Sequence, residues 1–305
     1  MTTRLTWLCF ILITSAGIPQ SLFSEEFKYL GQTPPDNTPV VFARGIISTE
    51  YQNHGVPAFS PDGKEVFWQI NKQDDQNNWI ISVMTMQRIE GNWTEPEVTP
   101  YGSGPVFSPD GKRLYFGSTE EGKNPYYADK QDDGWSEPKE IDLISRFPEL
   151  KFAYNLSVTS SGTLYFLGYT PEPGLWNNYG IYRSIFINGQ YTKPELLPEN
   201  INVRGDILNW TPFIAPDESY LIYSSMRVKP VDEYGDLYIS FRKADGRWTE
   251  RINLGESINT KTNERFPAVS PDGKYLFFTR WTPDYDEDVF WVSAEIIDSI
   301  KATKK

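Results

Sequence analysis

Seven side chains suited to ligand binding lie just before short apolar segments that recur along the chain. They are His54, Tyr154, Asn155, Asn209, Trp210, Glu264 and Arg265. Aromatic rings stack on sugar or peptide groups, an arginine binds a carboxylate through paired hydrogen bonds, and amides both donate and accept. We therefore predict that these residues form a binding site around a central channel, because converging polar groups mark a pocket. The alternative is that they line the channel and bind water.

Catalysis by the same region is a second hypothesis. His54 aligns with Ser103 in the next repeat, but a nucleophilic triad also needs an orienting acid in contact, and no spacing supplies one. Glycoside hydrolysis needs two carboxyl groups on opposite sides of a bond, and Asp206, Glu264 and Glu50 lie in connections between repeats. A carbohydrate-active enzyme of the glycoside hydrolase kind is therefore the alternative function, with no catalytic residue assigned.

The residue inventory argues against a metal or thiol centre. A single histidine and a single cysteine exclude a histidine-rich metal centre, a zinc–thiolate site and an internal disulfide. Asp284, Asp286 and Asp288 resemble alternating oxygen ligands for calcium, but the glycine and the closing glutamate of an EF-hand loop are missing. Acidic runs are usually solvated. The sequence therefore predicts no metal and no cofactor.

The composition of the 305 residues favours an all-β protein. Aromatic residues make up 15% of the chain, with 22 Gly and 23 Pro, which suits many short strands joined by turns. The net charge of −12 argues against nucleic acid as a partner, because nucleic acid favours a basic patch. The mean hydropathy of −0.50 excludes a bundle of membrane helices. The expected partner is a protein or a surface or extracellular glycan, without membrane insertion of the mature chain.

The first 24 residues are predicted to be a secretory signal peptide. Arg4 precedes the apolar run Leu5–Ile13, and small residues follow. This run is too short to span a bilayer, which needs about 20 apolar residues. Cleavage between residues 16 and 24 would remove Cys9, and an uncleaved N-terminal anchor is the alternative. The expected location is periplasmic or extracellular.

One turn motif recurs five times, about every 50 residues. It reads Ser-Pro-Asp-Gly-Lys at residues 60–64, 108–112 and 270–274, and altered copies lie at 159–163 and 215–219. Proline presets φ, aspartate bonds to its own backbone and glycine accepts a positive φ, so the motif is a tight turn. It joins a short apolar strand to an aromatic one, which indicates a hairpin. Self-similarity at this period is typical of a solenoid or a propeller.

Each repeat continues with a third strand, a second tight turn and a fourth strand, which is the make-up of a propeller blade. The last repeat ends in a third strand over residues 289–297, and the segment 38–48 supplies its missing fourth strand. The sequence therefore predicts an all-β, five-bladed β-propeller of four-stranded antiparallel blades, closed by an N-terminal strand. The domain spans residues 38–297, between a linker over 25–37 and a C-terminal tail over 298–305.

The turn motif, followed by a Leu-Tyr-Phe-like strand, resembles the WD40-like repeat of TolB-type β-propellers. The resemblance covers residues 38–297, and the pattern is similar to small secreted bacterial propellers that mostly lack an assigned activity. It implies an extracytoplasmic protein that binds other proteins or surface polymers. TolB proteins carry an additional N-terminal domain and six blades, and we expect neither here, so their particular partners are not implied.

Loop lengths predict which face of the propeller binds. The tight turns share one face, and longer loops share the opposite one, at residues 71–78, 118–124, 170–178, 227–234 and 280–288. Function collects on long loops carried by a rigid scaffold. The leading hypothesis is a secreted or periplasmic, non-enzymatic binding or scaffold propeller that recognises a protein or glycan through its long-loop face and channel mouth. Arg265→Ala and Trp210→Ala are expected to abolish binding without unfolding the protein.

Overall fold

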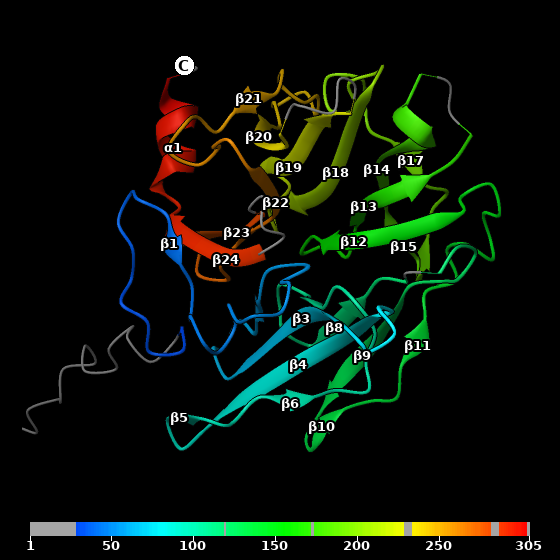
Figure 1. Cartoon of the computed structure of the whole chain (residues 1–305). Coiled ribbons are helices and arrows are strands. Elements are labelled where there is room, and N and C mark those ends of the chain that lie inside the picture. The colour runs from blue at the N-terminus through cyan, green and yellow to red at the C-terminus, as the bar shows by residue number, and fades with distance from the viewer. Residues whose placement is uncertain (1–28, 119, 172–173, 229–233, 282–286, 304–305) are drawn as a thin grey trace, which may run out of the picture.

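The computed structural model describes residues 29–118, 120–171, 174–228, 234–281 and 287–303 (Figure 1). Over these residues the chain forms five antiparallel sheets of four or five strands, together with one two-stranded hairpin. The predicted five-bladed β-propeller is therefore confirmed. The signal peptide predicted over residues 1–24 lies outside the described residues.

The first two blades follow one another along the chain, and in each the first strand is innermost. Blade 1 contains β2 (Ala58–Phe59), β3 (Glu65–Gln73), β4 (Trp79–Ile89) and a fourth strand in two pieces, β5 (Asn92–Trp93) and β6 (Glu97–Val98). Blade 2 contains β7 (Val106–Phe107), β8 (Arg113–Phe116), β9 (Tyr126–Gln131), β10 (Gly134–Trp135) and β11 (Lys139–Glu140).

The remaining blades have longer inner strands. Blade 3 contains β12 (Phe152–Val158), β13 (Leu164–Tyr169), β14 (Tyr179–Ser184) and β17 (Glu195–Leu196), with the hairpin β15 (Phe186–Ile187) and β16 (Gln190–Tyr191). Blade 4 contains β18 (Ile207–Ile214), β19 (Tyr220–Arg227), β20 (Asp236–Phe241) and β21 (Ile252–Asn253). Blade 5 contains β22 (Asn263–Val269), β23 (Tyr275–Trp281), β24 (Glu287–Ser293) and β1 (Val40–Val41). Inner strands of successive blades touch, so they surround a common centre.

The Ser-Pro-Asp-Gly turns are stabilised by the same hydrogen bonds in several blades. In blade 2, Ser108 Oγ donates to Asp110 Oδ1 at 2.6 Å and accepts from the amide of Arg113 at 3.0 Å. The hydrogen bond from Ser108 lowers the pKa of Asp110. Gly111 has φ +71°, and Gly273 has φ +75° at the same place in blade 5. The motif therefore fixes each hairpin locally.

Gly273→Ala is expected to lower the free energy of unfolding by about 1 kcal/mol, because L-residues other than glycine are strained at this φ. An added Cβ would meet no atom within 4 Å, so the loss comes from the backbone alone. Gly273→Asn is the matched control, since asparagine tolerates the left-handed region better. Urea unfolding measures both, and equal losses for the two variants would contradict the strain explanation.

The two ends of the chain close the ring in blade 5. Val40 and Val41 of β1 pair with Trp291 and Phe290 of β24, so the blue and red ends of the ribbon lie side by side (Figure 1). Part of the expected linker also packs there: Tyr29 is 1% exposed and donates to Asp272 Oδ1 at 2.7 Å. Aromatic rings from both ends thus build the core between blades 5 and 1.

The C-terminal segment differs from the expected strand and tail. β24 ends at Ser293 instead of residue 297, and a helix, α1 (Glu295–Ala302), follows. Ile297 is buried, and Ile296 and Ile300 pack against the same cluster of blades 4 and 5, so the helix covers an apolar edge. Apolar residues spaced by one, three and four positions fit a helical face. Within the residues that the structure describes, no helix reaches the length and apolarity that crossing a membrane requires.

Candidate functional site

Five side chains come from equivalent positions at the start of the five blades, and interactions connect them. Arg265 lies against Trp210, His54 lies beside the carboxylate that holds Arg265, and Tyr154 interacts with Ser103. This channel ring consists of His54, Ser103, Tyr154, Trp210 and Arg265. Each precedes a residue with positive φ: 141° at Gly55, 64° at Gly104, 51° at Asn155, 47° at Thr211 and 51° at Phe266. The pairing of β12, β18 and β22 with their neighbours shifts register at these positions. A bulge of this kind redirects a side chain and is common beside functional sites.

Arg265 is held by a buried carboxylate. Its Nε and Nη2 donate to Oε1 and Oε2 of Glu287 at 3.0 and 2.6 Å, and Thr279 Oγ1 donates to Oε1 at 2.6 Å. Burial raises the pKa of Glu287, while Arg265 and Thr279 act in the opposite direction. The guanidinium lies 5.4 Å from the centre of the Trp210 ring. Arg265 is therefore fixed in place before any ligand arrives.

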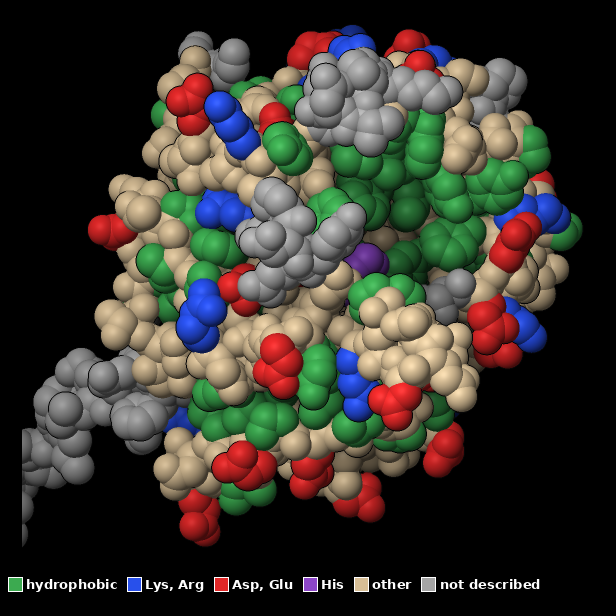
Figure 2. Space-filling model, viewed as in Figure 1, with side chains coloured by type: hydrophobic (Ala, Val, Ile, Leu, Met, Phe, Trp, Pro, Cys, Tyr) green, Lys and Arg blue, Asp and Glu red, His purple; other side chains and the backbone are tan. Residues whose placement is uncertain are grey.

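His54 lies beside this ion pair. Its Nδ1 is 4.0 Å from Oε2 of Glu287, and its ring meets Phe266 edge-on at 4.8 Å. Burial, helped by the positive charge of Arg265, lowers the pKa of His54 from 6.5 to about 3. The imidazole is therefore neutral at neutral pH. Figure 2 shows this purple side chain at the bottom of a hollow, next to a wide area of hydrophobic side chains.

The other ring members supply aromatic surface and hydrogen-bonding groups. Tyr154 is buried, which raises the pKa of its phenol. Within the described part of the chain, the buried Trp210 Nε1 has no hydrogen-bond partner. The side chain of Ser103 interacts with the phenol of Tyr154 and acts against the effect of burial on its pKa. Most buried polar atoms in proteins are partnered, so this indole N–H is an exception in the channel ring.

Asn209 and Glu264 do not face the channel. Asn209 Nδ2 donates to the carbonyl of Val203 at 3.0 Å, and Glu264 Oε1 accepts from Arg280 Nε at 2.9 Å. Both side chains are fully buried. They hold the connections between blades, so their prediction as ligand-binding residues is not supported by the geometry. Neighbouring residues of a strand point to opposite faces, and this alternation could have separated them from Trp210 and Arg265.

A cavity of about 490 Å³ occupies the channel between the ring and the Ser-Pro turns. Of the seven predicted residues, His54 and Asn155 line it, whereas Tyr154, Trp210 and Arg265 do not. Its walls include Ala58, Val106, Phe213 and Ala268, and its far end is bordered by Pro61, Pro109, Pro216 and Pro271. The cavity therefore extends toward the tight-turn face, opposite the face predicted to bind. The apolar walls of this cavity could have been predicted from the sequence, because four of the five repeats have an apolar residue two positions before the turn motif.

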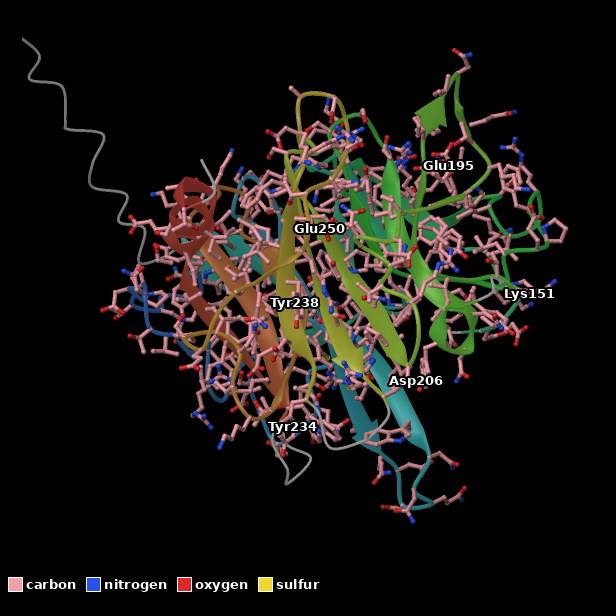
Figure 3. The ribbon with its side chains drawn as sticks, turned by 90° about the horizontal axis from the view of Figure 1, so that it is seen from above. Lys151, Glu195, Asp206, Tyr234, Tyr238 and Glu250 are labelled. Atoms are coloured by element: carbon pink, nitrogen blue, oxygen red, sulfur yellow. The ribbon has the colours of Figure 1, made fainter. Side chains whose placement is uncertain are left out.

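The carboxylates proposed for hydrolysis are scattered. Asp206 is exposed and lies, with Tyr234, at one end of the blades, while Glu195 and Glu250 lie at the other end (Figure 3). Glu50 is also exposed. Together with the arginine-bound Glu264, they do not form a facing pair in a pocket.

The acidic run considered for calcium is described in part. Asp284 and Asp286 lie outside the described residues, and Asp288 Oδ2 accepts from Arg44 Nη2 at 3.2 Å. Among the residues that the structure describes, no group of three or more His, Cys, Asp and Glu side chains is arranged to hold a metal ion.

These observations define the class of the protein as a five-bladed β-propeller with a polar and aromatic ring in its channel. No family model matches the sequence. No curated protein matches it either. The fold is similar to TolB from Acinetobacter baumannii, with 17% identity and a TM-score of 0.47, over 77% of this chain and 53% of TolB. The chain thus spans about half the length of that protein.

Two carbohydrate-active enzymes show a comparable likeness. The exo-β-1,3-galactanase 1,3Gal43A from Clostridium thermocellum has 12% identity and a TM-score of 0.49, over 83% of this chain and 62% of the galactanase. The α-L-arabinofuranosidase PaAbf62A from Podospora anserina has 11% identity and a TM-score of 0.46, over 85% of this chain and 96% of the enzyme. Likeness at this level concerns the propeller fold and not the site.

Proposed function

We propose that the protein is an exported, non-enzymatic binding propeller with TolB-like repeats, and that it holds a glycan over the channel ring on its long-loop face. The observation that supports this most is the convergence of an aromatic ring, a fixed guanidinium and an unpartnered indole N–H beside the channel. Pockets with a few converging polar groups are the usual binding sites. A protein partner is the other class left open by the sequence. The apolar run Leu5–Ile13 supports export.

Hydrolysis by paired carboxylates is the weaker hypothesis. Glu287 and Glu264 are each bound to an arginine inside the structure, through Arg265 and Arg280 respectively. A general acid and a base must both reach the bond that is cleaved. Neither glutamate is placed to do so while its arginine holds it.

Calorimetric titration with tetrasaccharides of glucose, xylose, arabinose, galactose and galacturonic acid tests the proposal. At least one is expected to bind and to stay intact. Trp210→Ala is expected to weaken that binding about tenfold or more, because stacking surface and the Nε1 donor are lost together. Trp210→Phe keeps a ring and should lose less. Phe186→Ala, on the tight-turn face beside Gly162, is the matched aromatic control.

Three results would contradict the proposal. Unchanged affinity in both Trp210 variants would exclude the channel ring as the site. Cleavage of a bound sugar would identify an enzyme. Absence of binding by every tetrasaccharide would exclude these glycans as ligands and favour a protein partner.

A further inference from the structure

A row of aromatic side chains crosses blade 3 at the long-loop end of its strands. Phe152 of β12 pairs with Tyr169 of β13, and Tyr169 pairs with Tyr179 of β14. The rings of Tyr169 and Tyr179 are 5.5 Å apart, and those of Phe152 and Tyr179 are 6.2 Å apart and nearly perpendicular. All three are half-buried, so each ring keeps exposed surface. The row therefore lies outside the hydrophobic core and offers aromatic surface on which a ligand could stack.

A hollow of about 460 Å³ lies over this row. Its lining consists of Glu121, Phe152, Tyr169, Asn177, Asn178 and Tyr179. Glu121 comes from the loop between β8 and β9, which is joined to blade 3 by the hydrogen bond from the amide of Gly122 to the carbonyl of Lys151 at 2.9 Å. Two neighbouring blades thus contribute to one hollow, which we name the blade 3 groove.

The two asparagines occupy a conformation that few residues tolerate. Asn177 has φ 45° and Asn178 has φ 64°, and both belong to the short 3-10 turn Trp176–Asn178. Asparagine is one of the residues that adopt left-handed backbone with little strain. The turn brings two amide groups to the edge of the aromatic row.

We propose that the blade 3 groove binds the units of a neutral oligosaccharide, extending the glycan site proposed above, on which this inference rests. A pyranose or furanose ring has an apolar C–H face and a rim of hydroxyl groups. The electron-rich faces of Tyr169 and Tyr179 suit the C–H face. Asn177, Asn178 and Glu121 supply donors and acceptors for the hydroxyls.

The groove adjoins the channel ring. Phe152 lies 5.7 Å from the ring of Tyr154, which belongs to the channel ring, and Trp176 extends the row outward at 6.3 Å from Tyr179. A ligand that covers the groove would therefore lie next to the channel ring. The volume of the groove suits several sugar units better than a compact cation, the other ligand that aromatic rings with a carboxylate attract.

The test is titration of the full chain with neutral tetrasaccharides of glucose, xylose, arabinose and galactose, with the matching monosaccharides and with choline chloride. The tetrasaccharide that binds is expected to do so at least tenfold more tightly than its monosaccharide. Tyr179→Ala is expected to weaken it about tenfold or more, and Tyr179→Phe, which keeps the ring, should weaken it less. Phe186→Ala on the same blade is the control, and circular dichroism with thermal melting verifies the fold of every variant.

The outcomes separate this inference from the proposed function. If Trp210→Ala weakens binding and Tyr179→Ala does not, the groove is overturned and the channel ring stands. If Tyr179→Ala weakens binding and Trp210→Ala does not, the groove stands and the channel ring is overturned. If no neutral tetrasaccharide binds at 5 mM, or if choline binds through Tyr179 instead, the assignment of the groove to neutral sugars is overturned.

Discussion

Arg265→Ala is expected to lower the free energy of unfolding by about 3–5 kcal/mol, the loss typical of removing one partner from a buried ion pair. Glu287 is 0% exposed and receives two hydrogen bonds from Arg265. The substitution would leave its carboxylate buried, with Thr279 Oγ1 still donating to Oε1. The sequence-based expectation that this variant binds poorly but stays folded is therefore replaced by an expected loss of stability. Urea unfolding at neutral pH measures it.

Two further variants test whether the loss of stability arises because the ion pair is buried. Arg265→Met combined with Glu287→Leu is expected to regain most of the lost stability, because apolar residues of similar size can replace a buried pair without penalty. Arg247→Ala removes an exposed partner of Asp245 and should change stability little. If Arg265→Ala and Arg247→Ala unfold at the same urea concentration as the unmodified protein, the ion pair is not a determinant of stability.

Acidification from pH 6.5 to pH 5 is expected to cost about 2 kcal/mol of stability through His54 alone, at about 1.4 kcal/mol per pH unit. The pKa of His54 is about 3 in the folded protein and 6.5 in the unfolded chain. Between these values the unfolded chain binds a proton that the folded protein does not, so stability falls as the pH falls. Above pH 6.5 His54 is neutral in both states, so it causes no loss of stability there. Protonation would place a second cation beside Arg265.

His54→Gln isolates this contribution, since glutamine does not titrate. The variant is expected to show a flatter dependence of unfolding free energy on pH between 7.5 and 5. Glu287 acts with the opposite sign, because its raised pKa makes the folded protein take up a proton first as the pH falls. Glu287 is present in both the unmodified protein and the His54→Gln variant, so its effect on the pH dependence largely cancels when the two are compared. Parallel pH profiles for the two proteins would show that His54 remains accessible to protons in the fold.

The fold was predictable because its signals are local. The hydrogen bonds of each Ser-Pro-Asp-Gly turn join residues within five positions of one another, as between Ser108 and Arg113. Five copies of one local signal give five hairpins, and the spare strand over residues 38–48 indicated closure. Repeat alignment also indicated which residues lie at equivalent positions of the blades, and Arg265 and Trp210 among them are in contact.

The partners of the ring residues were not predictable in the same way. The carboxylate that holds Arg265 is Glu287, in a strand two positions away in the sheet, and its place depends on the register of β22, β23 and β24. Asn209 directly precedes Trp210 in β18, so alternation along the strand turns its side chain to the opposite face, where it donates to the carbonyl of Val203. The blade 3 groove was missed because its rings become neighbours through strand pairing and not through spacing in the sequence.

The pairing of β1 with β24 also sets an order on folding. Val41 leaves the ribosome among the first residues of the propeller, yet its partner Phe290 is among the last. Strand β1 therefore has no pairing partner in the sheet until the other four blades have been synthesised. Contacts between residues so far apart in the sequence form late in folding. A circular permutant that joins residues 29–48 behind helix α1 would supply the fifth blade from one continuous stretch. In such a chain the strands of each blade would be consecutive in the sequence, so no strand would be synthesised long before its partner.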